Sequence, residues 1–286
     1  MTTKYYNKLA YEEIGDESNP IILFLHPKLL DKWVWIKQKE NHEKYFKDYL
    51  CIFLDLPHHG DSIYSGEFSI EESCDDIIEF IENLINENNK SKINLVALGL
   101  GGSIAIEIIS KKPNLIDNLI LSGLEISESR ENEEESVVKR LAKTQAEYLN
   151  EKPDRFIIKA YLRYFGISKD YYEDMEKILD RSVKEEEKIA FESLNYTIPE
   201  NLISNNEILK KENILFIFGN KEDLNCTKSA ICLKNLFENG KLVEIEKGNH
   251  LWNIIEHELF NTTIIDFIKS NHIEENDKVK LYKKIE

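Results

Sequence analysis

Five short segments of this 286-residue chain carry residue types that take part in catalysis or binding. Four contain histidine or carboxylate side chains, which transfer protons or orient one another: Phe24-Leu-His26-Pro27, Asp55-Leu-Pro-His-His-Gly-Asp-Ser62, Phe218-Gly-Asn-Lys-Glu222-Asp223 and Gly248-Asn-His250. The fifth, Leu95-Val-Ala-Leu-Gly-Leu-Gly-Gly-Ser103, is dominated by small residues. Glycine permits close contacts that other residues prevent, so this segment predicts a tight turn between packed elements.

The glycine-rich segment runs from a predicted strand, Ile93–Leu98, straight into a predicted helix, 101–111. This arrangement resembles the nucleophile elbow of the α/β-hydrolase family, G-x-S-x-G. In that alignment Ala97 takes the first glycine position and Gly101 the last, and Gly99 stands where the family carries its nucleophilic serine. The other four segments resemble further motifs of the family in the expected order and spacing, which makes the resemblance specific.

The resemblance implies a role for each site residue. His250 would act as general base and Glu222 would orient its ring, with Asp223 as the alternative acid. The backbone N–H groups of Lys28 and Leu100 would form the oxyanion hole. The resemblance covers about residues 5–270 and is closest to the cap-bearing, lipase- and esterase-like branch of the family.

The resemblance also implies the fold, an α/β class protein with a mostly parallel sheet, helices on both faces and an inserted helical cap. Ligands bind at the carboxyl ends of the strands of such sheets. We therefore expect a small-molecule cavity between the cap and the sheet, floored by Gly99, Leu100 and His250. Five further side chains are expected at this cavity: His26, Trp33, Trp35, His58 and Trp252.

Three departures from the family pattern bear on the chemistry. Gly99 has no side-chain oxygen, so no acyl-enzyme can form at this position. The nucleophile of the family holds a strained backbone that costs about 1–3 kcal/mol, and because glycine adopts it freely the fold should survive. Pro27 replaces a glycine and lacks an N–H group, although the expected donor is the next residue. His58 replaces another glycine and would place a titratable ring near the site.

Other side chains are weak candidates for a replacement nucleophile. Ser103 lies four residues into the helix and is expected to point away from the cavity, while Cys226 and Cys232 suit an apolar helix face. His59 matches a structural position of its loop. His250 could likewise be a residual loop histidine, but its spacing from the acid turn and from the following helix favours a site position.

The elements that must position these residues follow from the hydrophobic pattern, in which short apolar runs alternate with helical periodicity. The predicted strands are 4–14, Ile21–Leu25, Leu50–Leu56, Ile93–Leu98, Leu119–Ser122, Ile214–Phe218 and Leu242–Ile245. The clearest predicted helix begins at Ser69, where Ser69-Ile-Glu-Glu72 has the spacing of a capping box. Two others are predicted at 101–111 and 251–269.

The alternation breaks between about 126 and 208, a stretch rich in Glu, Lys and aromatic residues. We interpret 127–208 as the helical cap, inserted in a core made of 1–126 and 209–270, with a polar tail at 271–286. The aromatic residues of the predicted cap are expected to form its core, with some at the cavity: Tyr148, Phe156, Tyr161, Tyr164, Phe165, Tyr171 and Tyr172.

The composition argues against several classes of partner. A net charge of −16 argues against a nucleic-acid surface, which needs basic residues to bind phosphates. No apolar run reaches the roughly 20 residues of a membrane span, and the first residues lack a signal-peptide pattern; a cytoplasmic location is therefore expected.

The four cysteines, which form no CxxC pair, are expected to be free and mostly buried, with no metal site, and no cofactor is expected. The sequence leaves the oligomeric state open.

Three functional interpretations remain open. In the favoured one, the chain is a family member that keeps a capped cavity for a small organic ligand or ester-like substrate but has no serine-hydrolase activity. In the second, His250 and Glu222 act as a hydrolase or lyase without a covalent step. In the third, the chain is a serine esterase in which serine 99 was deliberately exchanged for glycine. A protein-interaction role would instead predict a flat apolar patch on the cap and no enclosed cavity.

Overall fold

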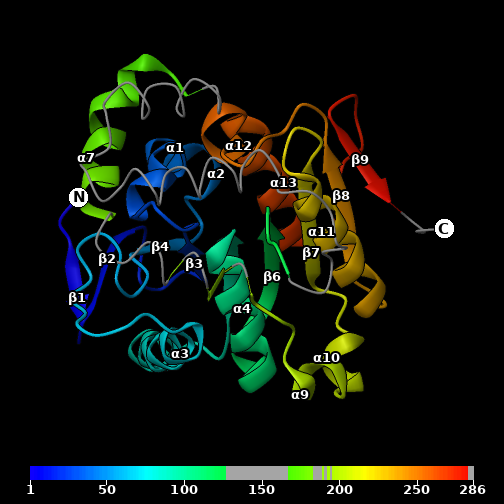
Figure 1. The fold of residues 1–286 in the computed structure, drawn as a ribbon, viewed down its shortest axis with the longest axis horizontal. Coiled ribbons are helices and arrows are strands. Elements are labelled where there is room, and N and C mark those ends of the chain that lie inside the picture. Colours follow the sequence, from blue (N-terminus) through cyan, green and yellow to red (C-terminus); the bar gives the residue numbers. More distant parts are fainter. Residues whose placement is uncertain (127–166, 183–188, 190–191, 194, 283–286) are drawn as a thin grey trace.

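The computed structural model describes residues 1–126, 167–182, 189, 192–193 and 195–282 (Figure 1). Its centre is a nine-stranded sheet with the order β1-β2-β4-β3-β5-β6-β7-β8-β9. The strands are β1 (Lys4–Tyr6), β2 (Leu9–Ile14), β3 (Ile21–Leu25), β4 (Leu50–Leu54), β5 (Ile93–Leu98), β6 (Ile116–Ser122), β7 (Ile214–Gly219), β8 (Lys241–Ile245) and β9 (Val279–Tyr282). Strands β3 to β8 pair in parallel, and antiparallel strands close both edges. The predicted α/β class is therefore confirmed.

The inner strands are buried because helices cover both faces of the sheet (Figure 1). Successive side chains of a strand point to opposite faces. In β3, Leu23 packs in a cluster with α3 (Ile70–Glu87) and α4 (Leu100–Lys111), whereas its neighbour Phe24 packs in a second cluster with α13 (His257–Ser270). This burial on two sides explains why the inner strands are near-continuous apolar runs.

The remaining helices connect the strands or extend these layers. They are α1 (Ile36–Glu40), α2 (His42–Tyr45), α7 (Tyr172–Ser182), α9 (Glu200–Ile203), α10 (Asn206–Leu209), α11 (Leu224–Leu236) and α12 (Trp252–Ile255), with 3-10 turns η1 (Lys32–Trp35), η2 (Pro113–Leu115) and η4 (Lys169–Tyr171). No helix among the described residues is long and apolar enough to cross a membrane.

One predicted helix start is confirmed, and one predicted helix is divided in two. Ser69 is the N-cap of α3, and its Oγ accepts a hydrogen bond from the N–H of Glu72 at 3.4 Å, as the capping-box pattern predicts. The helix predicted over 251–269 is divided instead. Glu256 separates α12 from α13, and its backbone (φ −108°, ψ 41°) lies outside the helical region.

The segments outside the regular core differ from the sequence prediction in detail. Most of the predicted cap, including five of its seven aromatic residues, lies outside the described residues. Part of 196–208 packs on the core, since Leu202 of α9 is fully buried in the cluster of α3 and α4. The stretch 271–286, predicted as a polar tail, contains β9, which pairs antiparallel with β8.

Candidate active site

The turn between β5 and α4 needs glycine at two positions, one for its backbone angles and one for close packing. Gly99 is the N-cap of α4 and has φ 49° and ψ −117°, in the region that favours glycine. A Cβ atom on Gly101 would lie 2.7 Å from the carbonyl oxygen of Leu25, so only glycine lets the helix start so close to β3. A Cβ atom on Gly99 would lie 3.2 Å from Nε2 of His250 and 3.0 Å from Cβ of Pro27. A side chain at position 99 would therefore face the histidine ring directly.

His250 is hydrogen-bonded to the glutamate. Its Nδ1 lies 3.0 Å from Oε1 of Glu222, whose side chain is 1% exposed. The second oxygen, Oε2, accepts the N–H of Gly219 at 2.8 Å. Asp223, the alternative acid, instead caps α11, where it accepts the N–H of Asn225 at 2.9 Å. With the Nδ1 proton donated to Glu222, Nε2 is left as a proton acceptor on the side of Gly99.

A third glycine, Gly123, supports this pair and was not recognised in the sequence. It follows β6 with φ 63°, and a Cβ atom there would lie 2.6 Å from Oε1 of Glu222 and 2.7 Å from Nδ1 of His250. Any other residue would displace the acid or the histidine. The available signal was a glycine directly after a predicted strand, Leu119–Ser122, on the same edge of the sheet as the other motifs.

His26 fixes the orientation of the peptide that carries the predicted oxyanion donor, the N–H of Lys28. Its ring is fully buried, and Nε2 accepts the N–H of Leu56 at 2.9 Å, so Nδ1 carries the proton and donates to the carbonyl of Pro27 at 2.8 Å. Burial lowers the pKa of His26 to about 3, which keeps the ring neutral. The two polar groups of a trans peptide point in opposite directions. Because the Pro27 carbonyl is held on the His26 side, the N–H of Lys28 points away from His26.

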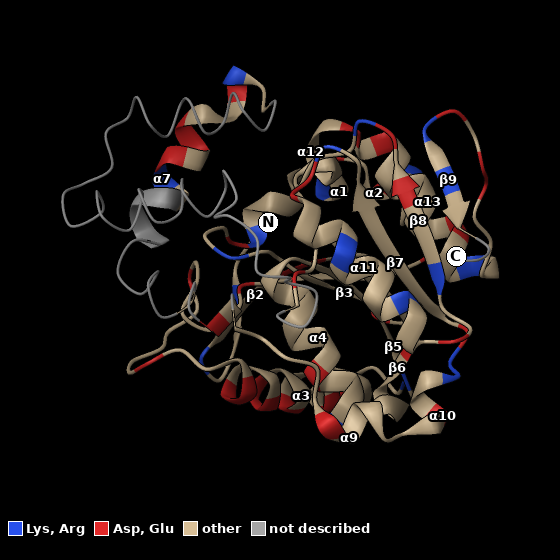
Figure 2. Cartoon of the chain, turned by 45° about the vertical axis from the view of Figure 1, so that its right-hand side comes forward, with Lys and Arg blue, Asp and Glu red and all other residues tan. Residues whose placement is uncertain are grey.

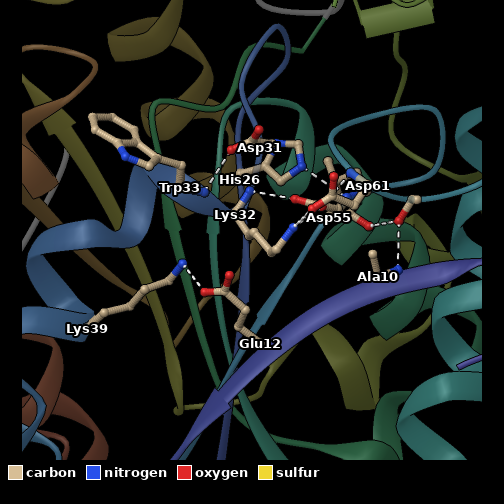
Figure 3. A network of polar contacts seen from close by, with 11 residues as sticks. Ala10, Glu12, His26, Asp31, Lys32, Trp33, Lys39, Asp55 and Asp61 are labelled. Atoms are coloured by element: carbon tan, nitrogen blue, oxygen red, sulfur yellow. Dashed lines mark hydrogen bonds and ion pairs between the residues drawn. The ribbon is translucent and has the colours of Figure 1, made fainter. Parts of the chain in front are cut away.

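A buried ion network holds the start of η1 next to this loop (Figure 3). The fully buried carboxylate of Asp55 accepts hydrogen bonds from the backbone N–H of Lys32 at 2.7 Å, the Lys32 ammonium at 2.5 Å and the N–H of Asp61 at 2.8 Å. Asp61 also contacts the same ammonium at 2.7 Å. Burial by itself lowers the pKa of Lys32, but the two carboxylates outweigh it and the pKa is raised. The motif Asp55–Ser62 therefore has a structural role, since its two carboxylates hold Lys32 and the start of η1 in place.

A cavity of about 390 Å³ opens over these groups. Gly99, Leu100, Gly123 and His250 line it, together with Lys28. The expected floor residues thus line the cavity, and Lys28 and Leu100, whose oxyanion-hole role stays a prediction, line the same space. Ser103, expected to point away, also lines the cavity.

The five other side chains expected at the cavity lie elsewhere, because the sequence does not show in which direction each one points. None of them lines the cavity among the described residues. Trp35 and Trp252 are buried in the core, where Trp252 donates to Ser122 at 3.0 Å. The ring of Trp33 packs against Tyr171, centroids 5.4 Å apart. His58, at a glycine position of the family, has φ 64° and packs against Tyr64 and Phe68, and His26 lies behind the loop.

Cys226 is the only cysteine that lines the cavity in the described part of the chain. Burial, and then the charge of Glu222, raises the pKa of its thiol well above the usual value, so the sulfur is protonated and a poor nucleophile. Cys226, Glu222 and His250 each offer a ligand atom within 4.8 Å of the others. His250 and Glu222 already share the Nδ1–Oε1 hydrogen bond, and the absence of a metal stays a prediction. All four cysteines are free thiols.

Comparison with known families agrees with this geometry. A sequence profile described as the alpha/beta hydrolase fold matches residues 20–257, most of the chain. The chain belongs to the α/β-hydrolase fold family. This α/β-hydrolase is also 27% identical over 107 residues to a Haemophilus influenzae protein named as an esterase/lipase. That match spans 36% of this chain and only 34% of the relative's length.

Solved structures of other proteins superpose over nine tenths or more of the chain. A lipase-esterase related protein of Clostridium acetobutylicum has a TM-score of 0.70 and 20% identity, with 91% of this chain and 99% of that chain covered. A malate-bound thermophilic esterase of Thermogutta terrifontis has a TM-score of 0.67 and 18% identity, covering 92% and 94%. A mutant meta-cleavage product hydrolase of Pseudomonas fluorescens, complexed with acetates, has a TM-score of 0.70 and 16% identity, covering 92% and 95%.

Proposed function

We propose that this α/β-hydrolase, of the ester and acyl hydrolase lineage, keeps a capped cavity for a small organic ligand and has no serine-hydrolase activity. The observation that carries the proposal is the position of Gly99. Its missing Cβ would lie 3.2 Å from Nε2 of His250, at the point where the family places its nucleophile. His250, Glu222 and the loop around Lys28, called here the donor loop, surround a position that has no side chain.

The remaining groups can bind a ligand oxygen without forming a bond to it. The N–H groups of Lys28 and Leu100 belong to residues at the cavity, and such donors stabilise a carbonyl or carboxylate oxygen. Nε2 of His250 can accept a hydrogen bond from the ligand or from water. Because no hydroxyl or thiolate lies between these groups at position 99, an acyl-enzyme is excluded there.

The fold relatives bind ligands of the size and chemistry that this cavity would suit. The Thermogutta esterase was solved with malate and the Pseudomonas hydrolase mutant with acetates. Both ligands are small carboxylates, and an ester hydrolase binds a carboxylate as its product. A small acid or ester is thus the ligand class that we assign to the cavity, with residues 127–208 as the cap over it.

The retained hydrogen bond between His250 and Glu222 favours a second candidate function. A histidine oriented by a buried carboxylate can remove a proton from water or substrate. In this alternative, water occupies the space of the missing serine side chain and attacks the substrate directly. No covalent intermediate would form.

Labelling and turnover separate these functions. A fluorophosphonate probe reacts with activated serines, so we expect no labelled protein by intact-mass spectrometry. Slow hydrolysis of p-nitrophenyl acetate that disappears in His250→Ala would favour the water-activating alternative. Stoichiometric labelling at any residue would refute both functions, because it would reveal a working nucleophile.

A further inference from the structure

Three lysines on the cavity wall have no carboxylate partner among the residues that the structure describes. Lys28, Lys221 and Lys247 line the cavity, and no carboxylate of the described residues lies within 4 Å of their ammonium groups. Acidic residues are plentiful, with 53 of them against 37 basic ones, and Figure 2 shows them concentrated along α3. Many other lysines do pair with carboxylates: Lys4, Lys32, Lys37, Lys39, Lys44, Lys111, Lys112 and Lys278.

The acids on the same wall are already engaged with the protein. Glu222 binds the N–H of Gly219 and the ring of His250. Asp223 caps α11. Glu125 accepts a contact from the Cys226 thiol at 3.9 Å. These carboxylates therefore already bind groups of the protein, whereas no carboxylate in the described part of the chain holds the three ammonium groups.

The backbone fixes where two of these lysines stand. Lys221 lies on the turn after β7 and Lys247 on the turn after β8, and each is exposed. The two turns are joined, because the N–H of Lys221 donates to the carbonyl of Gly248 at 2.9 Å and the N–H of Lys247 donates to Oδ1 of Asn220 at 2.7 Å. Lys28 is half-buried and belongs to the donor loop.

We propose that these three residues, the cavity lysines, make the cavity selective for a small organic anion, a carboxylate. This specifies the ligand class of the proposed function and rests on that function. The ligand's charge would lie between Lys28 in the wall and the paired turns, with the His250 ring also at the cavity. Charges interact more strongly beside low-dielectric walls than in open water, so even exposed lysines bias the choice between a charged ligand and its neutral analogue.

Isothermal titration calorimetry of the full chain with hexanoate and with hexanamide tests this proposal. The two probes have nearly the same shape and differ in charge. At low ionic strength we expect hexanoate to bind about 10-fold more tightly than hexanamide, since each exposed ion pair contributes a factor of about 2–5. Added salt should weaken hexanoate binding and leave hexanamide unchanged.

Charge removal provides the matched control. The triple variant Lys28→Gln, Lys221→Gln and Lys247→Gln should lose about 10-fold in hexanoate affinity and little for hexanamide. Lys210→Gln, at an exposed lysine that ends α10, should behave as the parent. Equal binding of both probes by the parent would overturn the selectivity but leave the cavity of the proposed function standing. A preference that survives the triple variant would refute the role of the lysines, and no binding of either probe would count against both proposals.

Discussion

Restoring the serine tests the alignment of the site, because every other group of an acyl-transfer site is expected to be in place. In Gly99→Ser the new Cβ would stand 3.0 Å from Pro27 Cβ and 3.2 Å from His250 Nε2. Both contacts are tight, so the histidine must retreat by a few tenths of an ångström. The backbone must also hold φ 49° with a side chain, which costs about 1–3 kcal/mol.

The gain in activity depends on how closely the new hydroxyl approaches its productive position beside His250. Loss of the serine from a protease triad costs a factor of about 10⁶ in kcat, and a catalytic group misplaced by about 1 Å costs about 10²-fold. A shift of a few tenths of an ångström should leave most of the gain. We expect Gly99→Ser to hydrolyse p-nitrophenyl acetate at least about 10³-fold faster than the parent and to react with a fluorophosphonate.

Gly99→Ala is the matched control, since it adds the same Cβ and the same strain without the oxygen. Urea unfolding should show the two variants equally destabilised, by about 1–3 kcal/mol. The additional change His250→Ala should remove the gained activity. If Gly99→Ser folds like Gly99→Ala and is equally inactive, the assignment of the elbow and its partners as an acyl-transfer site is wrong.

Three further predictions follow from the described contacts. Gly123→Ala would force a Cβ to 2.6 Å from the acid and 2.7 Å from the histidine at φ 63°; we expect a loss of at least about 2 kcal/mol in urea unfolding and loss of the activity restored by serine. Asp55→Asn removes the buried partner of the Lys32 ammonium, and differential scanning calorimetry should show a destabilisation of about 3 kcal/mol, because Asp61 still contacts the ammonium. Burial lowers the pKa values of His26 and His59 to about 3, whereas a histidine of the unfolded chain has a pKa of about 6.5. Below pH 6.5 the unfolded chain therefore binds more protons than the folded one, and the free energy of unfolding decreases as the pH is lowered. Between pH 6.5 and 5 the two rings should contribute a slope of up to about 2.7 kcal/mol per pH unit, about half of which His26→Gln should remove; a slope unchanged in that variant would contradict the prediction.

The sequence predicted best what depends on local pattern. The strands Ile21–Leu25 and Ile93–Leu98 have the predicted bounds, because residues buried on both faces form uninterrupted apolar runs. Gly99 was placed by glycine spacing, and its positive φ agrees with an elbow. These features need only a few neighbouring residues to be specified.

Side-chain direction and long-range pairing were not accessible in this way. Trp252 was expected at the cavity, yet its ring is buried and bonds to Ser122, more than a hundred positions away in the sequence. Gly123 is required only because two distant turns bring Glu222 and His250 against it. β9 is short and alternates apolar and polar residues, and it is recognisable as a strand only beside the free edge of β8.

The buried ring of His26 has a consequence for the energetics of binding. The hydrogen bonds from Leu56 and to Pro27 hold the peptide before Lys28 in one orientation without any ligand. A donor aimed in advance loses little conformational entropy when an oxygen arrives, so more of the contact energy is retained as affinity. The same rigidity prevents the N–H of Lys28 from turning toward ligands of another shape. The choice among ligands at this N–H is therefore fixed once the chain has folded.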